Sequence, residues 1–182
     1  MVLRLLLALS LISLSTGVLA DQQPEFDSEI QSAGQTLKLC STTKVKAYSM
    51  ILVGYSALYM EDCDSRGDDF FEKNKVLSFY YLRDVPKHAF QKSTLKFLQK
   101  NLSKETMVQL EPEIVHFNES YQDVGKDDQY KICFSSGEGL KLYLNDEVIS
   151  SNGNDELAKL YFNVWFGEKP FNKSMKKQLL KS

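Results

Sequence analysis

The sequence predicts one compact α+β domain. Residues 45–60 and 75–83 carry apolar side chains on both alternating faces, which is typical of central strands. Residues 129–144 alternate apolar and polar side chains around the glycine-rich stretch 136–139, which predicts a β-hairpin. A helical stripe follows the capping residue Asn154 and consists of Leu157, Leu160, Tyr161, Val164 and Trp165.

Further helices are predicted from their end signals. Pro86 fits the first turn of a helix, and Ser103 begins a second one that runs to about Tyr121. Pro112 is expected to kink or interrupt this second helix. Gly167 is expected to end the helix that follows Asn154 in a left-handed conformation, and Asn172 or Ser174 to cap a final Lys-rich helix.

The N-terminus reads as a secretory signal. Arg4 precedes an apolar run over residues 5–14, and Val18-Leu19-Ala20 supplies a cleavage site after Ala20. We expect residues 1–20 to be the signal peptide, residues 21–35 a flexible N-terminal segment and residues 36–182 a single domain. The mature protein is then periplasmic or secreted.

Composition excludes several classes of protein. The chain is 43% hydrophobic and 12% aromatic, which argues against disorder. Its lysines are scattered and its net charge is −2, so we expect no nucleic-acid partner. No stretch after the leader is apolar enough to span a bilayer, and we expect no stable membrane insertion. We expect a monomer.

An exported chain with three cysteines can form one disulfide and keeps one thiol. We favour Cys40 with Cys63, because both flank the predicted strand 45–60. A straight strand would separate its ends by about 50 Å at about 3.3 Å per residue. The pairing therefore requires a bend, for instance at Gly54, or a chain path that returns past Cys63. Cys133 lies in a strand pattern and is expected to be buried.

The sequence contains few residues in patterns typical of a catalytic site. His88 and His116 have no Cys, Asp or Glu at metal-ligand spacing, so we expect neither a metal nor a cofactor. Arg83 ends an apolar strand. It either pairs structurally with Asp84 or with helix carbonyls, or it anchors an anionic or phenolic ligand at a cleft. The strand tyrosines either belong to the core or line a pocket with their hydroxyls.

Three stretches, in this order along the chain, resemble the chalcone isomerase-like family, in particular its exported bacterial members of unassigned function. The first is residues 46–60, which end Tyr55-Ser56-Ala57-Leu58-Tyr59-Met60. The second is residues 77–85, an aromatic strand that ends in Arg83-Asp84. The third is residues 127–180, which contain Trp165-Phe166-Gly167-Glu168-Lys169-Pro170.

The resemblance implies an open-faced β-sandwich, in which a large antiparallel sheet carries a layer of helices and a ligand cleft lies between the sheet and this layer. It also implies two activities, since the plant enzymes cyclise chalcones to flavanones and relatives without the catalytic residues bind fatty acids. Where the enzymes place an Arg and a Thr, this sequence has Lys46 and Gly54. The catalytic Tyr and Asn have no match between Phe90 and Tyr121. Chalcone cyclisation is therefore not expected.

The sequence thus predicts an exported, non-catalytic protein that binds a small hydrophobic, acidic, fatty-acid-like ligand. Lys46 or Arg83 would face the acid group. Two alternatives stay open: an intramolecular lyase or isomerase of the chalcone isomerase type, and an envelope protein-interaction module without a small ligand. The predicted ligand-binding residues are Lys46, Tyr48, Tyr55, Tyr81 and Arg83.

Overall fold

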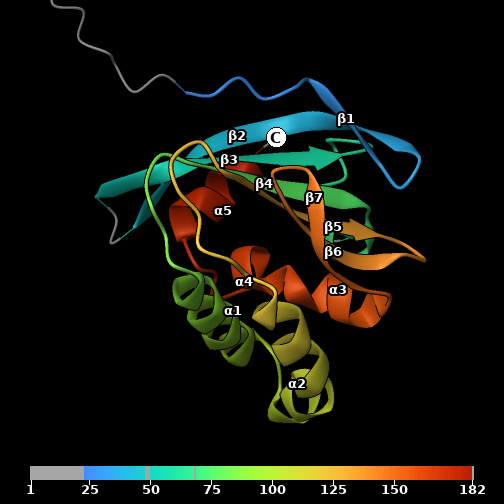
Figure 1. The fold of residues 1–182 in the computed structure, drawn as a ribbon. Coiled ribbons are helices and arrows are strands. Elements are labelled where there is room, and N and C mark those ends of the chain that lie inside the picture. The colour runs from blue at the N-terminus through green and yellow to red at the C-terminus, as the bar shows by residue number, and fades with distance from the viewer. Residues whose placement is uncertain (1–22, 48–49, 68, 182) are drawn as a thin grey trace, which may run out of the picture.

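The computed structural model describes residues 23–47, 50–67 and 69–181, so the predicted signal peptide and Tyr48 lie outside the described residues. Seven strands form one antiparallel sheet in sequence order, each paired with the next (Figure 1). The predicted α+β architecture is confirmed. The strands are β1 (Glu29–Ser32), β2 (Gln35–Ala47), β3 (Ile51–Met60), β4 (Lys75–Tyr81), β5 (Gln129–Ser135), β6 (Gly139–Leu144) and β7 (Glu147–Asn152).

The α-helices lie together on one face of this sheet (Figure 1). Three of them begin at the predicted caps: Ser103 accepts a hydrogen bond from the Thr106 amide, Asn154 from two amides and Asn172 from the Met175 amide. These caps satisfy backbone N–H groups that have no partner inside the helix. The helices are α1 (Lys87–Asn101), α2 (Lys104–Glu119), α3 (Asp155–Tyr161), α4 (Asn163–Phe166) and α5 (Lys173–Leu179), with a 3₁₀ turn η1 (Phe70–Glu72) before β4.

The single strand predicted for residues 45–60 is instead part of a hairpin. β2 ends at Ala47, β3 begins at Ile51, and these two residues are paired. The prediction was wrong because residues 45–53 contain no Gly, Pro, Asn or Asp that would mark a turn. The sequence pattern therefore runs through the reversal without a change of period.

This hairpin explains how Cys40 and Cys63 form a disulfide, with Cα atoms 5.2 Å apart. Lys38 pairs with Met60, so the start of β2 lies beside the end of β3. Cys40 sits at an irregularity in this ladder, and Cys63 follows β3 by three residues. The antiparallel return of the chain, and not a bend at Gly54, brings the two sulfurs together. Cys133 is free and buried.

Four local expectations differ from the structure. The segment expected to be flexible, residues 21–35, contains β1, which pairs with β2. Pro112 lies inside α2, which continues past it, and the helix after Asn154 divides at Phe162 into α3 and α4. Gly167 has φ −64°, which is not left-handed. Its lack of a side chain serves close packing, because a Cβ there would lie 2.6 Å from Asn101 Oδ1.

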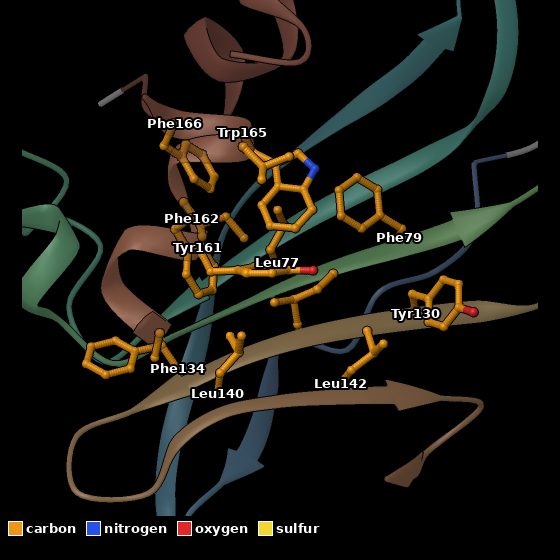
Figure 2. Close-up of a cluster of buried hydrophobic side chains, with 14 of the residues drawn as sticks. Leu77, Phe79, Tyr130, Phe134, Leu140, Leu142, Tyr161, Phe162, Trp165 and Phe166 are labelled. Carbon is orange, nitrogen blue, oxygen red and sulfur yellow. The ribbon is translucent and has the colours of Figure 1, made fainter. Parts of the chain in front are cut away.

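The main core fills the space between the sheet and the helices. Figure 2 shows Leu77, Phe134, Leu140 and Leu142 of the sheet facing the α3–α4 aromatic residues, which include Tyr161 and Phe162. A smaller cluster on the opposite face of the sheet is partly covered by the N-terminal segment, and it consists of Leu37, Ala57, Tyr59, Val76 and Cys133 with Phe26 and Ile30 packed against them. In the described part of the chain, no helix is both long and apolar enough to cross a bilayer.

Candidate functional site

A cavity of about 930 Å³ opens between the sheet and the helices. Its walls come from β2, β3, β4 and β5 on one side and from α1, α4 and the start of α5 on the other. A volume of this size is in the range of small-molecule sites, which are about 300–1,000 Å³. The cavity therefore makes this side of the sheet the candidate binding site.

The inner wall of the cavity is aromatic. Phe79 and Tyr81 of β4, Tyr130 of β5, Phe90 of α1 and Trp165 of α4 all line it. The Phe90 ring lies 5.2 Å from the Tyr130 ring and 5.7 Å from the Tyr81 ring, and Figure 2 shows Trp165 facing Phe79, with 5.7 Å between their centroids. Contacts at these distances hold aromatic rings in fixed relative orientations. The wall is thus an apolar surface of defined shape.

The rim of the cavity is positively charged. Four exposed cationic residues line it, and Asp84 is the one acidic residue among the described lining residues. Arg83 makes no ion pair or hydrogen bond with any residue that the structure describes. The structural pairing of Arg83 with Asp84 or with helix carbonyls is therefore not observed, and its guanidinium is available at the opening. The cations are Lys46, Arg83, Lys96 and Lys173.

The predicted site residues divide into two groups. Lys46, Tyr81 and Arg83 line the cavity. Tyr55 does not: it alternates along β3 with Ala57 and Tyr59, which belong to the cluster on the opposite face of the sheet. Because side chains alternate between the faces of a strand, Tyr55 faces away from this cavity, and the cavity gives no support to its predicted role in ligand binding. Tyr48 lies outside the described residues.

Several lining residues were not predicted. Phe90 and Trp165 belong to helices, and Tyr130 to an alternating strand pattern, and residues of a packed core have these same patterns. A residue that faces a cavity has the same periodicity as one that faces a packed core. The sequence carried no signal that separates the two.

The phenols of the inner wall are held in their neutral form. Burial raises the pKa of Tyr81 well above its ordinary value and the pKa of Tyr130 to about 12. The Tyr130 hydroxyl donates to the Gln122 carbonyl and accepts from the Gln122 amide, both at 2.9 Å. The Tyr121 hydroxyl lies 3.2 Å from that of Tyr161. These groups can donate hydrogen bonds near neutral pH, but they are poor general bases.

The family model of the chalcone isomerase-like proteins matches residues 21–181 of this chain. The chain belongs to the chalcone isomerase-like family. A crystal structure of a fatty-acid binding protein from Arabidopsis thaliana has a similar fold, with a TM-score of 0.64 and 16% sequence identity over 85% of this chain and 90% of that chain. A search of curated proteins finds no significant match.

Gly54, which the resemblance suggested as the counterpart of the catalytic Thr of the plant enzymes, is closed to any side chain. A Cβ on Gly54 would lie 2.0 Å from the carbonyl oxygen of Tyr80, which is far inside van der Waals contact. A hydroxyl cannot be placed there without moving β4. Lys46, the suggested counterpart of the catalytic Arg, is exposed at the rim.

The described residues also show no group of three or more His, Cys, Asp or Glu that could hold a metal ion. The described lining of the cavity contains no His, Cys or Glu. The arrangement is therefore suited to binding through apolar contact, positive charge and neutral hydrogen-bond donors.

Proposed function

We propose that this protein binds a small hydrophobic acid of the fatty-acid type in the cavity between the sheet and the helices, and that it does not cyclise chalcones. The observation that carries the proposal is the combination of an aromatic inner wall with a rim of four cations, of which Arg83 has no partner among the described residues. A similar fold in a fatty-acid binding protein supports it.

The cavity has an apolar wall that suits the tail of such a ligand and a cationic rim that suits its carboxylate. The tail would lie against the aromatic wall, where burying each CH₂ group contributes about 0.8 kcal/mol. The carboxylate would stay at the rim beside Arg83 and Lys46, which are both exposed. An acid in this orientation keeps its charge partly hydrated, so it avoids the large cost of burying an ion.

Export is also part of the proposal. The N-terminal sequence has the charge, apolar run and small residues of a signal peptide. The disulfide between Cys40 and Cys63 supports an oxidising compartment, since such bonds are rare in reducing ones. The ligand would therefore be met in the periplasm or outside the cell.

The test is a titration of the purified protein with hexadecanoic acid, read by displacement of a fluorescent fatty acid. We expect saturable binding that weakens several-fold in Arg83→Gln and in Lys46→Gln, because an exposed ion pair contributes about 0.2–1 kcal/mol. Lys104→Gln is the matched control, since Lys104 is exposed on α2 and does not line the cavity. Hexadecanol should bind wild type and the Arg83 and Lys46 variants equally. Absence of saturable binding to wild type would refute the proposal.

The two alternatives are tested in the same preparation. A chalcone panel should lose absorbance at the rate seen in buffer, because Gly54 leaves no room for the catalytic hydroxyl. An interaction module without a ligand would have a filled cleft, and the cavity of about 930 Å³ argues against it.

A further inference from the structure

Two polar groups on the inner wall of the cavity have no hydrogen-bond partner among the described residues. They are the hydroxyl of Tyr81 and the indole N–H of Trp165, and both residues line the cavity. Tyr81 is 6% exposed and Trp165 8% exposed, so each is more than nine-tenths buried. The buried side-chain atoms that lack a partner in the described part of the chain do not include these two atoms, so each keeps some access to the cavity. These two groups are therefore candidates for contact with a ligand.

The hydroxyl groups of the neighbouring tyrosines, by contrast, have hydrogen-bond partners within the protein. The Tyr130 hydroxyl bonds to both backbone groups of Gln122, and the Tyr161 hydroxyl donates to Asn118 Oδ1 at 2.8 Å. Tyr121 is within hydrogen-bond distance of Tyr161. The chain thus satisfies the other phenols of this region internally. The contrast singles out Tyr81 and Trp165.

The two groups belong to one stretch of wall. Phe79 neighbours both residues, with its ring centroid 6.4 Å from that of Tyr81 and 5.7 Å from that of Trp165. In Figure 2 the indole nitrogen lies at the end of the Trp165 ring that is nearer to Phe79. A ligand tail that passes over Phe79 would therefore run beside both donor residues.

The chemistry of the two donors defines what they can recognise. An indole N–H only donates, and burial raises the pKa of Tyr81, so its phenol keeps its proton near neutral pH. The matching ligand group must accept a hydrogen bond. The cations of this site are at the rim, and an anion buried here would have no counter-charge in the wall. The inner group is therefore a neutral oxygen.

We propose that the natural ligand is an oxygenated hydrophobic acid, with its carboxylate at the cationic rim and a hydroxyl or carbonyl oxygen in its tail bonded to Tyr81 and Trp165. This inference rests on the proposed function and narrows its ligand class. A plain fatty acid would leave both donors unpaired, so it would bind more weakly than its oxygenated counterpart.

The experiment compares hexadecanoic acid with hydroxy- and oxo-hexadecanoic acids that carry the oxygen at different positions along the chain. Each is titrated against wild type, Tyr81→Phe, Trp165→Phe and Tyr80→Phe by displacement of the same fluorescent fatty acid. Tyr80→Phe is the matched control, because Tyr80 does not line the cavity and its hydroxyl bonds to Asp127 Oδ1 at 2.5 Å. Thermal unfolding of each variant establishes that it is folded.

We expect at least one oxygenated acid to bind wild type about tenfold more tightly than hexadecanoic acid. The ratio of the affinity for this oxygenated acid to the affinity for hexadecanoic acid should fall several-fold in Tyr81→Phe or Trp165→Phe, and it should persist in Tyr80→Phe. Binding of hexadecanoic acid with no preference for any oxygenated isomer would overturn the inference and leave the proposed function standing. A preference that survives both cavity substitutions would overturn the assigned donors. If no acid of either kind binds, both proposals fall.

Discussion

Lys75 at the start of β4 has a fully buried side chain, with 0% exposure. Its ammonium donates hydrogen bonds to the carbonyls of Phe71, at 3.1 Å, and of Lys73. It also lies over three aromatic rings, with 5.0 Å to the centroid of Phe70, 4.7 Å to that of Phe134 and 5.0 Å to that of Phe162. This lysine thereby ties the η1 turn to the sheet and to the end of α3. We expect it to make the stability of the protein depend on pH.

Burial lowers the pKa of Lys75 from 10.5 to about 7, with a smaller opposing effect from Glu72. Between these two values the unfolded chain holds a proton that the folded protein has released. The free energy of unfolding must then rise with pH across this window, by up to about 1.36 kcal/mol per pH unit. Below the folded value both states are protonated, and Lys75 contributes no further slope.

The perturbation is Lys75→Met, which keeps a long flexible side chain and removes the charge. Urea unfolding of both proteins is followed from about pH 7 to about pH 9, where the wild-type free energy should rise relative to the variant by about 2 kcal/mol. Cys133 and the buried tyrosines are present in both proteins, so their titration cancels in the difference. Equal slopes would refute the reasoning. They would mean that the three rings and two carbonyls keep Lys75 protonated in the folded state.

Three other substitutions test the packing. Cys40→Ser with Cys63→Ser should lower the free energy of unfolding by about 3 kcal/mol, because the disulfide closes a loop with a sequence separation of 23; an equal urea midpoint for both proteins would contradict this. Gly54→Ala should destabilise by about 1–3 kcal/mol, since its Cβ would lie 2.0 Å from the Tyr80 carbonyl oxygen, and an unchanged melting temperature would be the contrary result. Ser56→Ala should leave stability unchanged or raise it by up to about 1 kcal/mol, because the buried Ser56 hydroxyl has no hydrogen-bond partner among the residues that the structure describes. A loss of more than about 1 kcal/mol in urea would show that this hydroxyl has a stabilising contact.

The parts of the fold that the sequence predicts well are those whose signals are local. The hairpin of β5 and β6 alternates clearly around its glycine turn, and Ser103, Asn154 and Asn172 cap helices as their side-chain chemistry requires. The reversal between β2 and β3 has no such signal. Residues 45–53 contain no Gly, Pro, Asn or Asp, so one long strand and two paired strands have the same appearance in the sequence.

The candidate site depends on contacts between distant segments, which single-sequence patterns do not report. Tyr55 and Tyr81 lie in similar aromatic strands, yet they face opposite sides of the sheet. The β2–β3 ladder also shifts register beside Val45 and Lys46, which changes the faces near the rim. Arg83 was recognisable because a cation at the end of an apolar strand needs a partner. Nothing in the sequence indicated the open cavity beside Arg83.

The central claim is that the cavity between β4 and α1 is the ligand site, and a cavity-filling substitution tests it most directly. Ala89 of α1 lines the cavity and is only half-buried, so Ala89→Trp can place an indole in the opening. We predict that wild type binds hexadecanoic acid at one saturable site and that Ala89→Trp, with its thermal unfolding unchanged, loses this binding at least tenfold. Equal affinity of the two proteins for hexadecanoic acid would contradict the account.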